Sequence, residues 1–153
     1  MNNEIQENLF EVLEHVLEQF AFAFCEIVDK DKVSDIPQEM IHSSLSFKGP
    51  YSGEIALVLS LDLCIELAGN VLGMDPGDEG VEDYGQDSLK ELLNVLIGNL
   101  LTELYGEDAF FDFATPHNKR LDKDAWDALV ADLSTLTMTI EDAPALLYFK
   151  IDK

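Results

Sequence analysis

Apolar and acidic residues follow a helical period in the first part of the chain. The apolar positions recur at steps of three and four residues, which is the spacing of an amphipathic helix. They are Ile5, Leu9, Val12, Leu13, Val16, Leu17, Phe20 and Phe24. The pattern predicts one long helix over Glu4–Val28, followed by a charged linker over Lys30–Gln38.

The pattern then changes to the two-residue period of a β-strand. Leu45 and Phe47 alternate with serines, which predicts a strand over Ile41–Lys48. A turn that contains glycine and proline follows at 49–53. The near-continuous apolar run over Glu54–Leu61 then indicates a central strand, buried on both faces.

Two helices are predicted next. The first covers Leu63–Leu72, with Asp62 as its N-cap and Gly73 at its C-terminal end. The acidic, glycine-containing segment Asp75–Tyr84 is expected to be a solvated loop. The second helix, over Gln86–Tyr105, has the best-defined leucine periodicity.

The C-terminal part of the chain predicts short strands and one further helix. These elements are a strand over Phe110–Ala114, a loop over the basic cluster Pro116–Arg120, a helix around Trp126 capped by Asp122 or Asp124, and strands over Leu136–Ile140 and Leu146–Ile151. The whole order of elements predicts an α+β fold, in which an antiparallel or mixed sheet packs against long helices. We expect a single domain over residues 1–153, because a chain of this length buries a full hydrophobic core.

A stripe of polar positions is predicted on the helix over Gln86–Tyr105. Asp87, Glu91 and Asn94 are spaced i, i+4 and i+7, so at roughly 100° per residue they fall within an arc of about 60°. Gly98 continues this arc, and we call the four positions the polar stripe. The opposite arc is apolar and comprises Leu89, Leu92, Leu93, Leu96, Ile97, Leu100 and Leu104. We therefore expect a helix that is anchored by its apolar back and presents the polar stripe to solvent.

The chain is strongly acidic, with a formal net charge of −22, although its apolar content of 47% is ordinary for a globular protein. The negative electrostatic field of such a chain repels nucleic acid and anionic lipid, so we expect neither as a partner. Cys25 and Cys64 lie far apart in apolar segments, as reduced thiols do in cytoplasmic proteins. The most apolar stretch, 55–72, contains Asp62 and Glu66 and is too polar to span a membrane. A cytoplasmic protein is therefore expected.

Common enzyme signatures for nucleotide binding, zinc hydrolysis and serine nucleophiles do not occur in the sequence. The three histidines, His15, His42 and His117, fall in different predicted elements and lack the spacing of metal ligands. We therefore expect the protein to hold no metal or cofactor of its own. The polar stripe is left as the candidate for chemistry.

An amide and a carboxylate on one helix face suit chemistry on a partner. A carboxamide both donates and accepts hydrogen bonds, so Asn94 can orient a water molecule without being a strong base. Hydrolysis of a phosphoryl group needs mainly in-line positioning of water and charge neutralisation. Glu91 can pair with a lysine of the phosphorylated partner. The tetrapeptide E-x-x-N alone is uninformative, because roughly 0.7 copies are expected by chance. Its position on the polar side of the helix, and Asp87 one turn earlier, make it a stronger indication of function.

The pattern Asp87-x-x-x-Glu91-x-x-Asn94, continued by Gly98, resembles the motif helix of the CheX/CheC-type chemotaxis phosphatases. The order of elements around it is similar as well, including the helix end at 70–73. In that family the asparagine orients the water that attacks the phospho-aspartate of a CheY-like response regulator, and the glutamate pairs with the regulator's active-site lysine. The resemblance implies these roles for Asn94 and Glu91. It further implies partner contacts at Asp87 and Gly98, and Mg²⁺ held by the regulator.

The chain also departs from the family pattern. It contains a single E-x-x-N motif, whereas CheC-type members usually carry two, so it is more similar to the dimeric CheX branch, and a homodimer is implied. Leu92 and Leu93 are bulkier than the residues expected inside the motif. Two alternatives remain open: a non-catalytic interaction module on the same fold, as in flagellar-switch proteins, and a family relative that has lost its activity.

Overall fold

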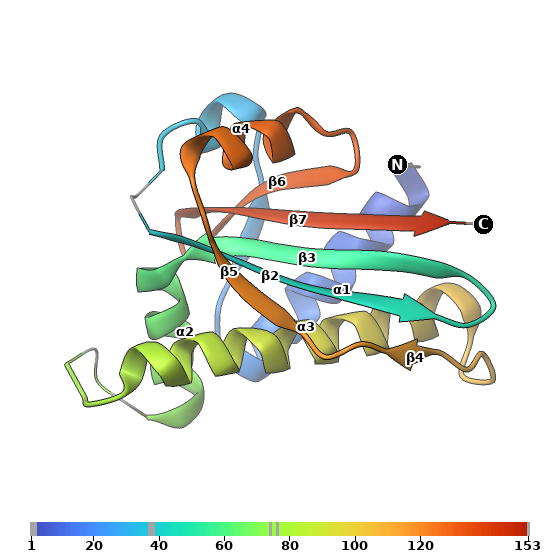
Figure 1. Cartoon of the computed structure of the whole chain (residues 1–153), viewed down its shortest axis with the longest axis horizontal. Coiled ribbons are helices and arrows are strands. Elements are labelled where there is room, and N and C mark those ends of the chain that lie inside the picture. Colours follow the sequence, from blue (N-terminus) through green and yellow to red (C-terminus); the bar gives the residue numbers. More distant parts are fainter. Residues whose placement is uncertain (1–2, 37–38, 74, 76, 153) are drawn as a thin grey trace.

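An antiparallel sheet with helices packed against it forms the centre of the protein (Figure 1). The structure is a computed structural model that describes residues 3–36, 39–73, 75 and 77–152. The helices are α1 (Asn3–Ala21), α2 (Leu61–Leu72), α3 (Val81–Tyr105) and α4 (Lys123–Ala131), with a 3-10 turn, η1 (Lys30–Val33). The strands are β1 (Cys25–Ile27), β2 (Met40–Lys48), β3 (Ser52–Ser60), β4 (Asp112–Phe113), β5 (His117–Leu121), β6 (Thr135–Ile140) and β7 (Ala143–Asp152). The predicted α+β fold is confirmed.

The strands lie in the order β1-β6-β7-β3-β2, and the outer edge of β2 is shared by β4 and β5. Strand β3 lies inside the sheet and pairs along its length with β2 and β7. Leu57, for example, lies between Ser43 and Leu147. Both faces of β3 are covered, which explains why its sequence is apolar almost without alternation.

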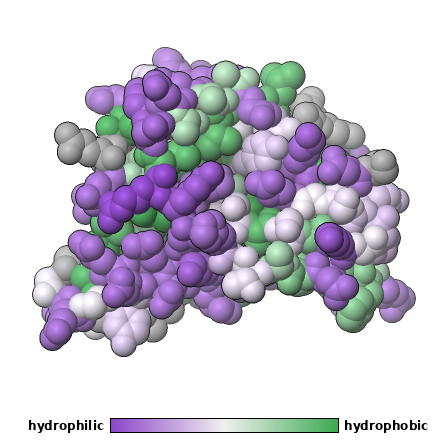
Figure 2. All heavy atoms as spheres, viewed as in Figure 1, coloured by the Kyte–Doolittle hydropathy of each residue, from purple (hydrophilic) through white to green (hydrophobic). Residues whose placement is uncertain are grey.

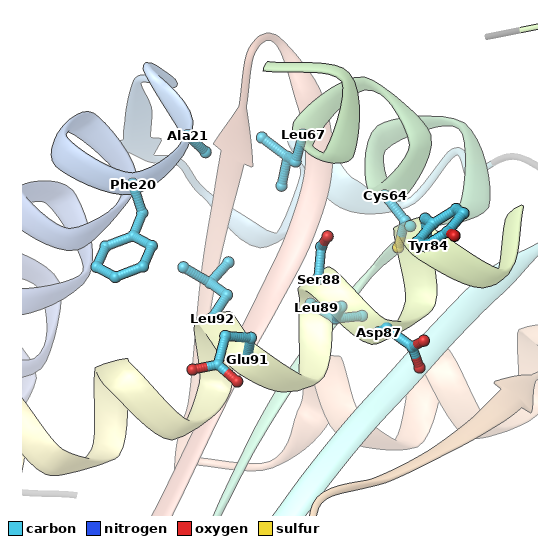
Figure 3. A pocket seen from close by; sticks show the side chains of 11 residues that line it. Phe20, Ala21, Cys64, Leu67, Tyr84, Asp87, Ser88, Leu89, Glu91 and Leu92 are labelled. Carbon is cyan, nitrogen blue, oxygen red and sulfur yellow. The ribbon is translucent and has the colours of Figure 1, made fainter. Parts of the chain in front are cut away.

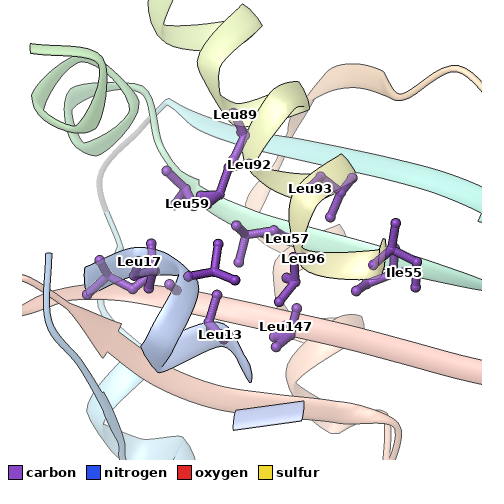
Figure 4. Close-up of a cluster of buried hydrophobic side chains, with 14 of the residues drawn as sticks. Leu13, Leu17, Ile55, Leu57, Leu59, Leu89, Leu92, Leu93, Leu96 and Leu147 are labelled. Carbon is purple, nitrogen blue, oxygen red and sulfur yellow. The ribbon is translucent and has the colours of Figure 1, made fainter. Parts of the chain in front are cut away.

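The larger part of the core lies between one face of the sheet and the helices α1, α2 and α3 (Figure 4). Its buried side chains come from α1, β3, β7 and α3, and include Leu13, Leu17, Ile55, Leu57, Leu59, Leu93, Leu96 and Leu147. A smaller cluster on the other face lies under α4 and η1. There the fully buried Trp126 packs with Met40 and Val58, and its indole N–H donates to the Val33 carbonyl at 2.9 Å.

Helix α1 ends at Ala21, so the prediction of a helix as far as Val28 is wrong. Phe22 adopts a left-handed backbone conformation with φ 52°, which ends the helix. The chain then extends as β1, and the Glu141 N–H donates to the Phe24 carbonyl at 2.9 Å. Phe24 stands at helical spacing in the sequence, but it is exposed because pairing with β6 decides the local conformation.

The boundaries of the next helical elements also differ from the predictions. The predicted linker Lys30–Gln38 contains η1, because Val33 is buried in the cluster around Trp126; residues 37–38 lie outside the described part. Ser60, rather than Asp62, caps α2, and its hydroxyl accepts the Leu63 N–H at 3.0 Å.

The C-terminal end of α2 and the start of α3 depend on two glycines. The predicted end of α2 at Gly73 is confirmed, with φ 69°. Helix α3 begins at Val81, so the prediction of a loop as far as Tyr84 is wrong. Gly80, with φ 77°, directly precedes the helix, and the acidic residues of its first turn favour a helix N-terminus. The buried Val81 side chain further stabilises this earlier start.

Strand β5 was not predicted, since Pro116–Arg120 was expected to be a loop. Its side chains are mainly polar, and the strand forms because its backbone pairs with β2, with Asn118 opposite Ser43. Strand β4 retains only Asp112–Phe113 of the longer predicted strand. Of the two predicted caps of α4, Asp122 is the one that the structure has. The two C-terminal strands are confirmed, but β7 begins at Ala143, three residues before the predicted start, because Glu141 and Asp142 alone form the turn, both at positive φ.

The burial of Trp126 predicts a stability effect. Trp126→Phe removes the indole donor and leaves the buried Val33 carbonyl without its partner, so the free energy of unfolding should fall by about 2 kcal/mol in urea titration. Leu133→Ala is the matched control just after α4: Leu133 is 79% exposed, and the change should stay within about 0.5 kcal/mol. Equal stability of the two variants would contradict the structural role of Trp126.

Candidate functional site

Helix α3 is held with its apolar side against the core. Leu93, Leu96 and Ile97 are fully buried, as the sequence pattern predicts. On the opposite side of the helix, Asp87 and Glu91 are exposed, and Asn94 and Gly98 are half-buried. The structure thus brings the four positions of the polar stripe to one accessible face of α3.

The polar side chains of the stripe are not engaged with the rest of the chain. Across residues 3–36, 39–73, 75 and 77–152, no hydrogen bond or ion pair of an Asp87, Glu91 or Asn94 side chain is present. The ion pairs Arg120–Glu39 and Lys123–Asp127 lie elsewhere. An exposed acid and amide without an internal partner are available to bind another molecule.

The start of the stripe is anchored from two sides. On one side, α2 approaches closely: a Cβ at Gly85 would lie 3.2 Å from the carbonyl carbon of Cys64. On the other side, the Asn118 amide in β5 donates to the Gln86 carbonyl at 3.0 Å, one residue before Asp87. Asn118 therefore positions the stripe, although the sequence placed it in a loop; its role depends on strand pairing, which no local pattern reveals.

Gly98 has a different environment from Gly85. A Cβ at Gly98 would meet no heavy atom within 4 Å, so the described fold does not require a glycine there. A glycine inside a helix costs about 1 kcal/mol relative to alanine. Beside Gly98 lies a shallow hollow of about 210 Å³, which Phe110 and Phe113 also line. The surface next to Asn94 is thus open at the C-terminal end of the stripe.

At the N-terminal end of the stripe lies an apolar groove of about 280 Å³ (Figure 3). It is bounded by the C-terminal end of α1, by α2 and by the first turns of α3. We call it the α1–α3 groove and define it by Phe20, Leu67, Tyr84, Ser88, Leu89 and Leu92. Asp87 and Glu91 stand at its rim, so the groove and the stripe form one continuous surface. No local sequence pattern predicts this groove, because it lies between three separate helices.

The two cysteines and His42 do not contribute reactive groups to the stripe. Burial raises the pKa of the Cys64 thiol to about 12, so it is no nucleophile near neutral pH. Burial, and then the nearby Glu14, raise the pKa of Cys25 to about 12 as well. His42 shares the sheet face of Met40, opposite α3, and burial followed by nearby Lys119 lowers its pKa.

Two structural features are absent from the described residues. No group of three or more His, Cys, Asp or Glu side chains there could hold a metal ion. No helix among them has the length and apolarity needed to cross a membrane. Hydrophilic side chains cover much of the face that Figure 2 shows, and apolar side chains emerge at the end that carries β4. The candidate site is therefore the acidic, partly apolar surface along α3.

Solved structures with the same fold include chemotaxis proteins and FliY. The chemotaxis protein CheX of Vibrio vulnificus superposes with a TM-score of 0.71 at 16% identity, covering 97% of both chains. A chain from the CheX–CheY–BeF3–Mg²⁺ complex of Borrelia burgdorferi matches with a TM-score of 0.64 at 14% identity, covering 96% of this chain and 97% of that one. FliY of Thermotoga maritima matches with a TM-score of 0.56 at 19% identity, over 99% of this chain and 90% of that one. At these identities the likeness establishes the fold.

Sequence comparison assigns the family. No curated protein matches the chain. The family model described as chemotaxis phosphatase CheX matches residues 41–122, a segment that runs from β2 to the end of β5 and includes the complete polar stripe. Because this match covers more than half of the chain and contains the helix that presents Glu91 and Asn94, the protein belongs to the CheX family of chemotaxis phosphatases.

Proposed function

We propose that this protein hydrolyses the aspartyl phosphate of a CheY-like response regulator. The observation that carries the proposal is the pair Glu91 and Asn94, which stand about one turn apart on the accessible face of α3 and have no hydrogen-bond or ion-pair partner in the described part of the chain. Membership of the CheX family supports the reaction class. The Borrelia burgdorferi complex, which pairs a CheX with a CheY, supports the kind of partner.

In this proposal Asn94 orients the attacking water. Its carboxamide hydrogen-bonds the water and holds its oxygen in line with the acyl phosphate bond. A new P–O bond forms from the water, the bond to the regulator's aspartate breaks, and the water's protons leave with inorganic phosphate. The regulator supplies the Mg²⁺ that neutralises the phosphoryl charge. The protein contributes alignment, which is the main requirement of a loose transition state.

Glu91 fixes the register of the complex. Its carboxylate is exposed and unpaired within the described residues, and it pairs with the active-site lysine of the regulator. Asp87 lies one turn earlier on the same face and adds negative charge toward that lysine. Gly98 leaves the other side of Asn94 without a side chain, so the regulator can approach the helix closely.

Replacement of Asn94 tests the catalytic assignment. Asn94→Ala should lower kcat for phosphate release by about 100-fold, because the water loses its orientation. Binding of a regulator loaded with BeF3⁻ and Mg²⁺ should change little. The matched control is Asn99→Ala on the same helix: Asn99 is exposed, and its amide donates to the Val95 carbonyl at 2.8 Å, away from the stripe. This control should keep the wild-type rate.

Two results would overturn parts of the proposal. If Asn94→Ala and wild type speed phosphate loss equally, Asn94 does not orient the water. If the wild type binds the loaded regulator and does not speed phosphate loss at all, the enzyme assignment fails. That second result would favour the non-catalytic interaction module or a relative that has lost its activity.

Neutralising Glu91 tests the ion pair. Glu91→Gln keeps the size of the side chain and removes its charge, so the KM for phosphorylated regulator should rise about tenfold at low salt. The increase should shrink as ionic strength rises, because salt screens exposed charges. Glu103→Gln, an exposed acid on α3 outside the stripe, is the control and should leave KM within about twofold. Equal KM shifts for both variants would indicate a general charge effect in place of a specific pair.

The homodimer that the family resemblance implies is also part of the proposal. One chain has a mass of 17.1 kDa, and light scattering on the purified protein at micromolar concentration should give about twice that mass. The mass of a single chain, unchanged across the concentration range, would refute the dimer without touching the proposed reaction.

A further inference from the structure

The α1–α3 groove is open although its floor is apolar. Leu67, Leu89 and Leu92 form the floor and are nearly fully buried. Two aromatic side chains form its walls and remain largely accessible: Phe20 is 43% exposed and Tyr84 is 50% exposed. In Figure 3, Ser88 points from α3 into the space between them. A small side chain at this central position leaves the groove unfilled.

Local packing explains the shape of the groove. The contact of Gly85 with the Cys64 backbone lets α3 approach α2 closely. Helix α1 ends at Ala21 and turns away through the left-handed Phe22, so it does not cover the gap. The space therefore results from the positions of three helices, and no described segment of the chain closes it.

The size and charge of the groove restrict its occupant. Its volume of about 280 Å³ has room for a large side chain and lies near the lower end of the roughly 300–1,000 Å³ that small-molecule and cofactor sites occupy. Asp87 and Glu91 place carboxylates at the rim of an apolar floor. This combination is complementary to an apolar side chain with a cationic neighbour.

The groove is continuous with the proposed catalytic surface. Glu91 belongs both to the rim of the groove and to the polar stripe, and Asn94 follows within one turn of α3. A regulator that docks on Glu91 and Asn94 must therefore cover the groove. A groove left empty beneath the docked regulator would forfeit the free energy of burying its apolar floor.

We propose that the α1–α3 groove is a specificity subsite that binds one large apolar side chain of the response regulator, next to a Lys or Arg that faces Asp87 and Glu91. This proposal rests on the proposed function for its partner. The subsite selects the regulator by binding, whereas Asn94 acts on the phosphoryl group. Burial of one such side chain is worth about 10- to 100-fold in affinity.

Two variants test the subsite by opposite changes in shape. Ser88→Phe fills the groove from its centre, and Tyr84→Ala removes one wall; both variants keep Glu91 and Asn94. Ser88→Phe should raise the KM for phosphorylated regulator at least tenfold, and Tyr84→Ala about threefold to tenfold, with kcat within twofold of wild type. Glu103→Phe places the same new side chain on an exposed position of α3 outside the groove and should leave KM unchanged. Circular dichroism melting should show that all three variants fold.

The regulator side of the contact can be tested with a double-mutant cycle. Each exposed Phe, Leu, Ile or Met near the active site of the regulator is replaced by Ala, and KM is measured with wild type and with Ser88→Phe. One replacement should raise KM with wild type about tenfold and should have little further effect with Ser88→Phe, since the two changes remove the same contact. Fully additive effects for every replacement would overturn the assignment of the occupant.

The outcomes separate this proposal from the proposed function, provided that binding of the BeF3⁻- and Mg²⁺-loaded regulator is titrated alongside activity. If wild type is active and both groove variants bind and react as wild type does, the subsite is wrong and the phosphatase stands. If wild type binds the regulator without hydrolysis and Ser88→Phe weakens that binding, the subsite stands and the phosphatase fails. If Ser88→Phe and Glu103→Phe weaken binding equally, the effect is one of surface hydrophobicity, and the subsite is overturned.

Discussion

Burial of the apolar side of α3 is the interaction on which the rest of the structure depends. Leu93, Leu96 and Ile97 are removed completely from solvent, and each contributes about 2 kcal/mol through its burial. A rotation of the helix by one residue, about 100°, would expose part of this face. An exposed ion pair contributes at most about 1 kcal/mol, so no polar contact of the stripe could offset that loss. The core therefore decides which way Glu91 and Asn94 face.

The same constraint separates stability from function along one helix. The leucines hold α3 against the sheet and α1, while the polar side chains of the stripe make no hydrogen bond or ion pair within the described chain. Asn118 of β5, and the close packing of Gly85 on the Cys64 backbone of α2, refine the placement just before Asp87. Leu92 and Leu93, which are bulky for the motif, are both buried, so their size serves the core and leaves the stripe unobstructed.

The ends of the stripe are less polar than its middle. The α1–α3 groove lies at one end, and the hollow beside Gly98 lies at the other. An acidic middle between two apolar hollows offers a partner both steering charge and surface to bury. The strong acidity of the chain, which the sequence analysis took as evidence against nucleic-acid and lipid partners, has a local counterpart in Asp87 and Glu91 at the groove rim.

Local sequence patterns predicted the elements whose conformation depends on neighbouring residues. The leucine period defined α3 and the side on which its stripe lies, the apolar run defined β3, and Gly73 and Asp122 marked helix ends. The predictions failed where segments distant in the sequence decide the local conformation. Phe24 continues a helical period, yet the helix ends at Ala21, and Phe24 is exposed just before β1, which pairs with β6. Pro116–Arg120 has no strand pattern, yet the free edge of β2 makes most of it a strand.

By itself, the sequence thus determined the fold class, the family resemblance and the face of α3 on which Asp87, Glu91 and Asn94 lie, because amphipathic periods and motif spacing are properties of contiguous residues. Only the tertiary structure decided how α1, α2 and α3 stand around the α1–α3 groove, and that Asn118 secures the start of the stripe. Those features arise from contacts between residues far apart in the chain. Their geometry is set by packing and strand pairing, which leave no periodic trace in the sequence.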